Sequence, residues 1–554
     1  MGAPVWISAP SITLTPGNGE LGYTITASDP VADSYDVYYI EGSETDGAAI
    51  KAGGTLIASS PLTGTISPLS NWQIYSFIVT AHKTGYADCD SLSASEMPVV
   101  PLANAERRFV KVGGAGSGTT WEDASGNIQA MMNELASGGG EVWVAAGKYV
   151  PGSTRDATFT LKNNVKVYGG FPAGITDATP QAFAMRERNA RFNTFGIISD
   201  ASCETIMSGD IGNNDTYAAD SGLLTANYLD NVYHVVTGAN GAVLDGFTIK
   251  GGYAFGSALE NKSGGGMNNY YSSPVLTNVT IAGNQAVDGG GMVNSNSSPI
   301  LINVTIAGNQ VSSFGGGMVN SNSSPILTNV TIAGNQALNG GGGMYNSESS
   351  PILTNVTIAG NQVSGGGGGM SNTFSSPILT NVTIAGNSSS GMYNYSSSPI
   401  LTNVTIAGNS GGGMHTFYPD SSPSIRNSIV WGNTGGNVFI EYCTPTWTNS
   451  LVEGSTWDTT NWGTNSGGTC GTISTNPFES AIPAAPTTGG NYQLKAGVIG
   501  AIDAGSNALY FDQAMPSDWN VKTGLDWAET LAKDLAGNTR KVNNIIDMGA
   551  YEKQ

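Results

Sequence analysis

One segment of this chain repeats seven times, in nearly identical form, between Ser272 and Asn433. A full copy reads Ser-Ser-Pro-Ile-Leu-Thr-Asn-Val-Thr-Ile-Ala-Gly-Asn, and then come a variable stretch, Gly-Gly-Gly-Met and an Asn. Subtracting their positions shows that the repeat prolines lie 22 to 26 residues apart: Pro274, Pro299, Pro325, Pro351, Pro377, Pro399 and Pro423. The length varies only between the Gly-Asn pair and the next Met, which indicates a surface loop on a fixed unit.

The repeat is composed of residues that favour strands and turns: Val, Ile, Thr, Asn, Gly, Ser and Pro. In one copy Val330 and Ile332 alternate with Thr331, while Asn329 interrupts the alternation after Leu327. This pattern predicts two short strands bent at the Asn, with Leu, Val and Ile pointing inward. A third short strand is predicted at residues 344–346 and their equivalents, with the Met inward.

A unit of such short strands cannot bury its own inner face, so the copies must stack about 4.8 Å apart and pair with one another. The repeat therefore predicts a parallel β-helix with equivalent residues in columns. The Leu and Met columns of the predicted core are Leu276, Leu301, Leu327, Leu353, Leu379 and Leu401, and Met267, Met292, Met318, Met344, Met370, Met392 and Met414.

The same register predicts three columns of Asn. They are Asn278, Asn303, Asn329, Asn355, Asn381, Asn403 and Asn427 at the bend; Asn284 through Asn433 at the Ala-Gly-Asn corner; and Asn269, Asn294, Asn320, Asn346, Asn372 and Asn394 after the Met. An amide carries both a donor and an acceptor, so stacked Asn side chains can bond along the stack. We expect structural ladders, with ligand binding as the less favoured role.

The charge balance bounds the partners. Lys and Arg number 21 against 41 Asp and Glu, which gives a net charge of −20 and a pI near 4.4. Nucleic acid is an unsuitable partner because phosphate neutralisation needs a basic surface. No apolar run is long enough for membrane insertion, and no basic-then-apolar leader begins the chain. We expect an exported protein, extracellular or on a bacterial cell surface, whose signal peptide has been removed.

The flanks differ from the repeats and predict two domains. Residues 1–101 alternate like strands, and Leu69 followed by Tyr75 resembles the tyrosine corner of fibronectin type III domains. That resemblance predicts a β-sandwich. Residues 102–554 are expected to form the β-helix, with an N-terminal cap and irregular coils at 102–260, the near-identical repeats at 261–433, and irregular coils with a C-terminal cap at 434–554. Ile128, Met131 and Leu135 fall on one face of a short helix that would cover the first coil.

Several motifs outside the repeats resemble those of a known family. They lie at residues 109–111, 121, 145–149, 168–171, 208–210, 534–538 and 547–552. Together with the repeats they resemble the bacterial right-handed parallel β-helix surface proteins, which are pectate-lyase-like in fold and related in repeat style to polymorphic outer-membrane proteins. The resemblance covers residues 105–552 and implies an all-β, right-handed solenoid. It leaves the function open, because such proteins include adhesins, secreted proteins of unknown role and polysaccharide-degrading enzymes.

The distribution of charge argues against catalysis on the repeats. Their few charged residues, Asp288, Glu348, Asp420 and Arg426, are scattered in loops and form no recurring carboxylate pair. We therefore predict a non-catalytic adhesin or carbohydrate-binding stalk that meets a polysaccharide, a cell-surface glycan or a host protein. The alternative is a polysaccharide lyase or glycoside hydrolase whose site lies outside the regular repeats.

Aromatic residues supply the candidate ligand-binding surface. Tyr345 and Tyr393 each follow an inward Met and should point outward, and further aromatic residues lie just beyond on successive coils: Phe374, Tyr395, Phe417 and Tyr418. An exposed strip of such rings would stack against sugar rings. The alternative is that the rings fold down and cover the loops.

A second candidate site gathers oxygen ligands in the loop of Asp210, Asn213, Asn214 and Asp215. Calcium favours such ligands, but the spacing is not that of an EF-hand, so an Asx-rich turn is the preferred alternative. No other cofactor is predicted.

Two further features leave alternatives open. Cys443 and Cys470 lie about one coil apart and could form a disulfide or remain buried thiols. The outward Thr column resembles the hydroxyl arrays of ice-binding solenoids, which makes ice binding a lesser alternative: Thr280, Thr305, Thr331, Thr357, Thr383 and Thr405. The neighbouring column is interrupted by Ile302. A cap at each end of the solenoid favours a monomer.

Overall fold

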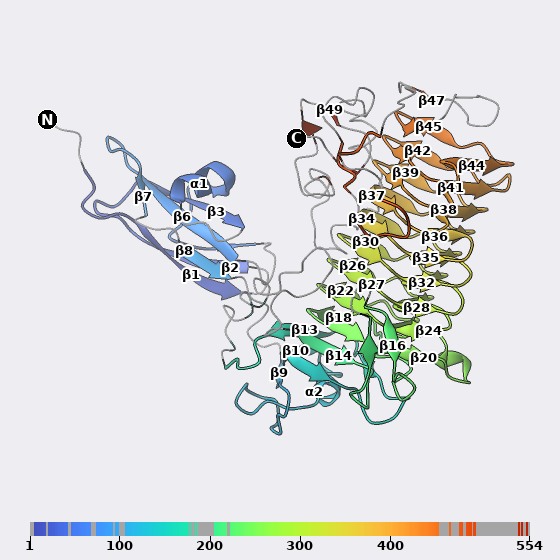
Figure 1. Ribbon diagram of the computed structural model, residues 1–554. Coiled ribbons are helices and arrows are strands. Elements are labelled where there is room, and N and C mark those ends of the chain that lie inside the picture. The colour runs from blue at the N-terminus through green and yellow to red at the C-terminus, as the bar shows by residue number, and fades with distance from the viewer. Residues whose placement is uncertain are drawn as a thin grey trace. The chain divides into compact units, whose positions relative to one another are not determined.

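The computed structural model describes most of the chain. The described residues are 5–17, 20–41, 46–67, 74–91, 95–98, 106–176, 178, 183, 186, 204–218, 222–453, 465–466, 476–479, 483–489, 491–494, 534, 541–542, 545–546 and 550–551. The chain divides into two compact units (Figure 1), the first of which is residues 1–107 with two short later segments, 119–122 and 174–191. The domain boundary predicted at residue 101 falls in the stretch 99–105, outside the described residues.

The first unit is built of two antiparallel sheets. One sheet has the order β1 (Ser11–Gly17), β2 (Glu20–Thr26), β5 (Thr63–Ile66). The other has the order β4 (Thr55–Ile57), β3 (Ser34–Glu41), β6 (Ile74–His82), β7 (Cys89–Asp90), with β8 (Ser95–Pro98) also on β6. Leu21 and Tyr23 of the first sheet share one core with Val37, Phe77 and Val79 of the second. The predicted β-sandwich is present, and a short helix, α1 (Gly47–Gly53), accompanies it.

The second unit is the predicted parallel β-helix, in which each turn contributes strands to three long parallel ladders. The strands before the Asn bend are β18 (Val243–Asp245), β22 (Val275–Thr277), β26 (Ile300–Ile302), β30 (Ile326–Thr328), β39 (Ile400–Thr402), β42 (Ser424–Arg426) and β45 (Thr446–Thr448). Those after it are β14 (Thr205–Ser208), β19 (Thr248–Lys250), β23 (Thr280–Ala282), β27 (Thr305–Ala307), β31 (Thr331–Ala333), β40 (Thr405–Ala407), β43 (Ile429–Trp431) and β46 (Leu451–Val452). Two strands, β34 (Ile352–Ala359) and β37 (Ile378–Ala385), run through the bend.

The third ladder is a ten-stranded parallel sheet that carries the Met column. Its strands are β12 (Phe159–Thr160), β17 (Val236–Thr237), β21 (Met267–Tyr270), β25 (Met292–Ser295), β29 (Met318–Ser321), β33 (Met344–Ser347), β36 (Gly367–Thr373), β38 (Ser390–Tyr395), β41 (Gly412–Phe417) and β44 (Val438–Glu441). A smaller parallel sheet lies beyond the Ala-Gly-Asn corner, in the order β20 (Tyr253–Ala254), β24 (Gln285–Ala286), β28 (Gln310–Val311), β32 (Gln336–Ala337), β35 (Gln362–Val363).

The remaining elements lie at the ends of the solenoid. The first turns contain β9 (Arg107–Val110), β10 (Gly140–Ala145), β11 (Gly147–Tyr149) and β13 (Val165–Phe171), then the hairpin β15 (Thr216–Tyr217) and β16 (Leu224–Ala226) and the 3-10 helix η1 (Leu259–Asn261). The last strand of the solenoid sheet is β47 (Asn465–Ser466), and β48 (Lys541–Val542) and β49 (Ile545–Ile546) form a separate antiparallel pair. The predicted capping helix is α2 (Ile128–Glu134), whose Asn127 cap accepts the amide of Ala130. Its Ile128, Met131 and Met132 join the solenoid core.

The core consists of the predicted columns. The Leu and Met residues of successive repeats pair in register and are fully buried in one continuous cluster. Stacking places like residues on like, so a shape that packs in one turn packs in the next. Removing one Met from this column should cost about 2–5 kcal/mol, as for other large-to-small core substitutions.

All three Asn ladders form, and they differ in what they hold. At the bend each Asn takes a left-handed backbone, with φ between +48° and +56° across the seven repeat positions, a conformation that Asn tolerates better than most residues. In the ladder after the Met, each Nδ2 donates to the next Oδ1 at 2.8 Å. At the corner, each Asn also accepts a backbone amide from the preceding turn, as Asn335 does from Asn309. Most of these amides are paired within the fold, which matches the structural role predicted for them, although Oδ1 of Asn269 at the start of its ladder is buried without a hydrogen-bond partner in the described part of the chain.

The predicted outward Thr column is not an open array. Thr280, Thr383 and Thr405 are buried, and Thr305, Thr331 and Thr357 are half-buried. A later segment of the chain covers part of the column, since the amide of Ala550 donates to Oγ1 of Thr405 at 3.0 Å. In addition, Phe478, Tyr492 and Leu494 pack on Trp431 and Leu451 beside the column. The column therefore lacks the long, flat, exposed hydroxyl face that the ice-binding alternative needs.

The structure describes only one of the two cysteines for which a disulfide was considered. Cys443 is a free, half-buried thiol whose Sγ donates to the carbonyl of Thr416 at 3.6 Å. Burial raises the pKa of this thiol. Its predicted partner, Cys470, lies outside the described residues.

Candidate binding surface

The outer face of the Met-bearing sheet carries the candidate site. In β33, β36 and β38 the Met and the ladder Asn point inward, as do Met414 and Thr416 in β41, so the residue after the Met points outward. Register places Tyr345, Ser371, Tyr393, His415 and Phe439 in one outward column on β33, β36, β38, β41 and β44. The column two residues later contains Ser347, Thr373, Tyr395, Phe417 and Glu441.

The structure brings five of the six predicted aromatic residues together on the last repeats. Tyr393 and Phe417 have ring centroids 5.0 Å apart, Tyr395 and Tyr418 4.5 Å apart, and Phe374 and Tyr395 meet edge to face at 5.7 Å. We call Phe374, Tyr393, Tyr395, Phe417 and Tyr418, with Phe439, the aromatic strip. These separations are typical of favourable aromatic pairs.

Tyr345, the sixth residue, is separated from the strip by the turn that carries Ser371. Its ring packs on Phe314 at 4.6 Å instead. Tyr345 therefore fits the alternative in which a ring covers a loop.

The corner that follows the Met-bearing strand exposes further rings. Phe374 and Tyr418 are 59% and 47% exposed, and Tyr442 on the next turn is 75% exposed. All three have a left-handed backbone, with φ of +51°, +79° and +61°. Asn296 and Asn322 occupy the same corner lower in the stack, each with φ of +50°.

This backbone is costly for a bulky side chain. A non-Gly residue in a sparsely populated region costs of order 1 kcal/mol or more, and Asn is among the residues that tolerate it best. The repeat already uses Asn at this corner, so the backbone conformation gives no reason for Phe374 or Tyr418, although both rings pair with Tyr395. Rings held outward at an energetic cost are a feature of a surface that meets something else.

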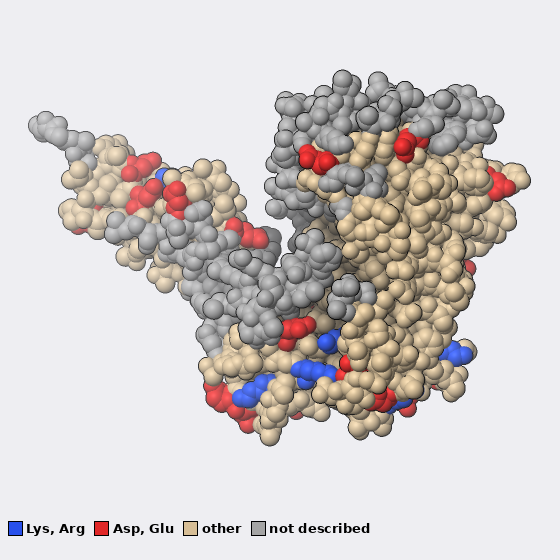
Figure 2. All heavy atoms as spheres, viewed as in Figure 1, with Lys and Arg blue, Asp and Glu red and all other residues tan. Residues whose placement is uncertain are grey.

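The strip has an acidic neighbour, because Glu441 is in register with Phe417 and its charge acts on Tyr393. Figure 2 shows one face of the molecule, on which the surface over the repeats is almost free of charged residues while both basic and acidic residues gather over the first turns. Burial raises the pKa of Tyr393, and the Tyr418 hydroxyl bonded to Tyr395 raises the pKa of Tyr395. Burial lowers the pKa of His415, so this imidazole is neutral at pH 7. The strip thus presents neutral rings and hydroxyl groups with the Glu441 side chain beside them.

Sequence reasoning missed three members of this surface. They are His415, Phe439 and Tyr442. The His415 ring centroid lies 6.2 Å from that of Phe417 and 5.4 Å from that of Phe439, and Tyr442 follows at the corner. The missed signal is an eighth, degenerate copy: Val438–Glu441 occupies the register of the Met-bearing strand without its Met.

The predicted calcium loop is organised around a lysine. Lys148 Nζ lies 2.7 Å from Oδ2 of Asp210 and 2.8 Å from Oδ1 of Asn213. The amide of Asn214 donates to the other oxygen of Asp210 at 3.0 Å, and Asn213 has φ of +54°. The Lys148 ammonium group contacts two of the oxygens that would bind calcium. The loop therefore fits the Asx-rich turn alternative.

Asp215, the fourth predicted ligand, has hydrogen-bond partners of its own. Its oxygens accept Nδ2 of Asn231 at 2.9 and 3.1 Å and the hydroxyl of Tyr217 at 2.9 Å. Burial raises the pKa of Asp215 to about 6, although both hydrogen bonds act to lower it. The pKa of Asp210 is lowered despite its burial, because hydrogen bonds from Lys148 and from the amide of Asn214 favour the ionised carboxylate. The two carboxyl groups are thus in different electrostatic environments.

The described residues also bear on metal binding and on membrane insertion. No group of three or more His, Cys, Asp and Glu is arranged to hold a metal ion in the part of the chain that the structure describes. Within the same residues, every helix is too short or too polar to cross a bilayer.

The fold and this surface define a right-handed parallel β-helix protein with an aromatic outer face. The family model described as "Right handed beta helix region" matches residues 319–476, which agrees with the predicted handedness. No curated protein matches the sequence. Among solved structures, the family 28 exopolygalacturonase of Yersinia enterocolitica is similar at 11% identity with a TM-score of 0.28, covering 81% of this chain and 99% of that chain.

Proposed function

We propose that this protein is a non-catalytic, carbohydrate-binding stalk or adhesin that is exported to a bacterial cell surface or beyond it. The observation that carries the proposal is the aromatic strip with its corner rings. Rings exposed on a rigid sheet lose little side-chain entropy on binding and offer flat apolar faces to sugar rings.

The columnar architecture supports the proposal. The strip runs across successive turns about 4.8 Å apart, so an elongated ligand meets several rings at once. Several weak contacts on one rigid support give a higher overall affinity than any single contact. The neighbouring Glu441 and the net charge of −20 favour a ligand without strong negative charge.

The N-terminal sandwich is a fibronectin type III-like spacer in this proposal. Its two antiparallel sheets, of three and five strands within the described residues, support that assignment. Of the tyrosine corner proposed from Leu69 and Tyr75, the structure describes only Tyr75, whose hydroxyl donates to Glu41 at 3.2 Å. Leu69 lies outside the described residues.

The chain itself suggests a sharp test of the strip. Phe374→Asn and Tyr418→Asn introduce the residue that the repeat uses at this corner in Asn296 and Asn322, so both variants should fold as well as the parent protein or better. Glu348→Asn, at the same corner outside the strip, is the matched control. On a glycan array, we expect the double variant to lose at least about tenfold in affinity, which corresponds to about 1.4 kcal/mol.

Reducing-sugar and unsaturated-product assays run beside the array separate binding from catalysis. Binding without turnover, lost in the double variant and kept in the control, supports the proposal. Turnover of a bound glycan, or equal binding by all variants, contradicts it.

One observation keeps the hydrolase alternative under test. The pKa of Asp215 is raised to about 6 and the pKa of Asp210 is lowered. The acid and base groups of glycosidases also have pKa values that their environments push apart. Ion-pair networks without a catalytic role shift pKa values in the same way. If any polysaccharide is cleaved, Asp215→Asn must abolish the cleavage for this pair to be the catalytic site.

A further inference from the structure

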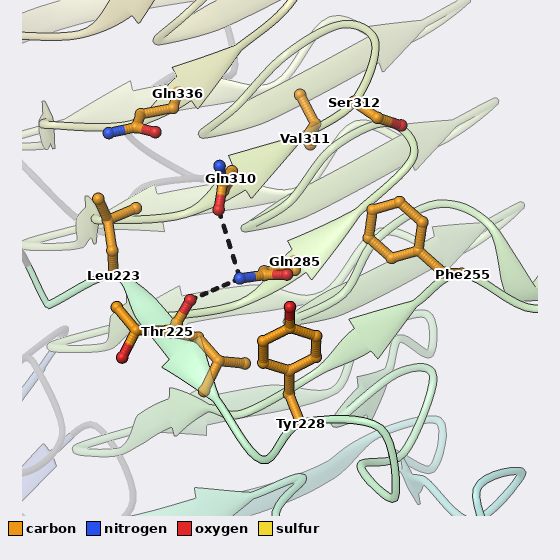
Figure 3. A pocket seen from close by; sticks show the side chains of 10 residues that line it. Leu223, Thr225, Tyr228, Phe255, Gln285, Gln310, Val311, Ser312 and Gln336 are labelled. Carbon is orange, nitrogen blue, oxygen red and sulfur yellow. Dashed lines mark hydrogen bonds between the residues drawn. The ribbon is translucent and has the colours of Figure 1, made fainter. Parts of the chain in front are cut away.

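A groove on another part of the solenoid is lined by side-chain amides that the fold leaves only partly hydrogen-bonded. It lies beside the small sheet of β24, β28 and β32 and has a volume of about 490 Å³, within the range of about 300–1,000 Å³ usual for ligand sites. Gln285, Gln310 and Gln336 from successive turns line one side, and Tyr228 and Phe255 from the irregular first turns also line it (Figure 3).

The glutamine column differs from the Asn ladders in its unused hydrogen-bonding groups. Gln285 Nε2 donates to the carbonyl of Leu224 at 2.6 Å and to Oε1 of Gln310 at 3.3 Å. Beyond that pair the column stops bonding to itself: within the described chain, the side-chain amide of Gln336 makes no hydrogen bond. Amides that neither pair along the stack nor contact another element leave donors and acceptors directed to the groove and the solvent.

The aromatic wall is held in place before any ligand arrives. Tyr253 packs between Tyr228 and Phe255, with ring centroids 4.8 and 4.7 Å away. The guanidinium of Arg155 lies 5.5 Å from the ring of Tyr253, and its Nε donates to the carbonyl of Asn231 at 2.9 Å. Such support fixes the exposed Phe255 ring in one orientation and reduces the entropy lost on binding.

The chemistry of the groove selects among ligands. The backbone amides of Gln310 and Gln336 donate to Asn284 and Asn309 of the preceding turns, so recognition by strand addition to these turns has no free donors there. Among the described residues that line the groove, none is charged. An anionic sugar would find no counter-ion, and the net charge of −20 would repel it.

We propose that this groove binds a neutral oligosaccharide. The amides of Gln310 and Gln336 exchange hydrogen bonds with its hydroxyl groups, while Phe255 and Tyr228 pack against the apolar face of a ring. Gln285 and Gln336 are two turns apart, about 10 Å along the stack, so the bound stretch is two or three sugar rings long. The groove is independent of the aromatic strip and would function even if the strip met a protein.

The test uses the full chain and isothermal titration calorimetry. The probes are neutral tetrasaccharides of β-1,4-glucose, β-1,4-mannose and α-1,4-glucose, with tetragalacturonate as the anionic comparison and an extended Ser/Thr-rich peptide as the protein comparison. Gln336→Ala removes one groove amide. Gln362→Ala is the matched control, because Gln362 belongs to the same column one turn further on, outside the groove.

We expect at least one neutral tetrasaccharide to bind at millimolar concentration or better. Gln336→Ala should weaken it about 3- to 10-fold, the effect of one hydrogen bond, and Phe255→Ala about tenfold. Gln362→Ala should leave it unchanged, and all variants should melt with the parent protein. The same titrations in the Phe374→Asn, Tyr418→Asn background separate the groove from the strip, since only strip binding would respond to those two substitutions.

Three results would overturn the groove proposal. They are binding of none of the neutral probes, tighter binding of tetragalacturonate or of the peptide, and equal losses in Gln336→Ala and Gln362→Ala.

Discussion

Removing one amide from the corner ladder tests the claim that the Asn columns are structural. Asn335 is fully buried, and its Nδ2 donates to the carbonyl of Ile306 at 2.9 Å and to Oδ1 of Asn361 at 3.0 Å. Its Oδ1 accepts both the backbone amide and the Nδ2 of Asn309, each at 3.0 Å. Asn335→Ala removes all four hydrogen bonds at once.

The magnitude follows from what each former partner keeps. Oδ1 of Asn361 still accepts the backbone amide of residue 335, and Nδ2 of Asn309 still donates to Ile281 at 2.9 Å. The backbone amide of Asn309 loses this acceptor inside the protein, which costs about 1–3 kcal/mol. With roughly 1 kcal/mol for each of the two lost donor bonds, the free energy of unfolding should fall by about 3–5 kcal/mol.

The matched control is in the same repeat. Asn329 lies at the exposed bend with φ of +56°, and its Nδ2 donates to Asn303 at 3.2 Å in an exposed ladder. Asn329→Gly keeps the left-handed backbone accessible and removes only these exposed bonds, so it should cost about 1 kcal/mol.

Urea unfolding, with hydrogen exchange followed by mass spectrometry across residues 300–340, measures both changes. Exchange resolves the turn concerned, because the stability of a solenoid is a sum of neighbouring repeat terms. We expect faster exchange around residue 309 in Asn335→Ala and little change in Asn329→Gly. Equal effects of the two substitutions, or a loss below about 1 kcal/mol for Asn335→Ala, would refute the distinction between the ladders.

Three further predictions concern other parts of the solenoid. Met318→Ala should lower the free energy of unfolding by about 2–5 kcal/mol, whereas Val319→Ala on the outer face of the same strand should cost less, as urea titration would show. Because the folded protein keeps the Asp215 proton up to about pH 6 and the unfolded chain loses it near pH 4, stability should fall as pH rises through that window; Asp215→Asn should flatten this part of a melting-temperature profile. Since Lys148 already neutralises Asp210, calcium should not raise the melting temperature of the parent protein; a clear shift, larger still in Lys148→Ala, would support the calcium site over the Asx-rich turn.

The repeat made the fold of the solenoid readable because its contacts are translations of one another. Once Leu327, Val330 and Met344 are assigned inward in one copy, stacking fixes the same assignment in the next, and the structure has these columns in register. The bend at Asn329 was predictable for the same reason, since Asn is among the few residues that accept a left-handed backbone. The outward direction of Tyr393 followed from the inward Met before it.

Contacts made by the irregular flanks were not readable. Gln285 meets Leu224 across 61 residues, and the groove also needs Phe255, which no periodicity connects to the Gln column. The cover over Thr405 comes from Ala550, 145 residues away. Lys148, 62 residues away in the sequence, binds Asp210, which had been predicted as a calcium ligand.

The sequence by itself therefore determined the columns: which residues face inward, where the chain bends and which side chains stack. That information is local, because a repeat needs only its own copy one turn away to bury its inner face. The tertiary structure decided which outward residues are exposed, paired or covered, since that depends on where non-repeating segments return to the solenoid. The aromatic strip and the glutamine groove are functional candidates for this reason: the fold explains the residues beneath them and leaves these outer side chains available to a ligand.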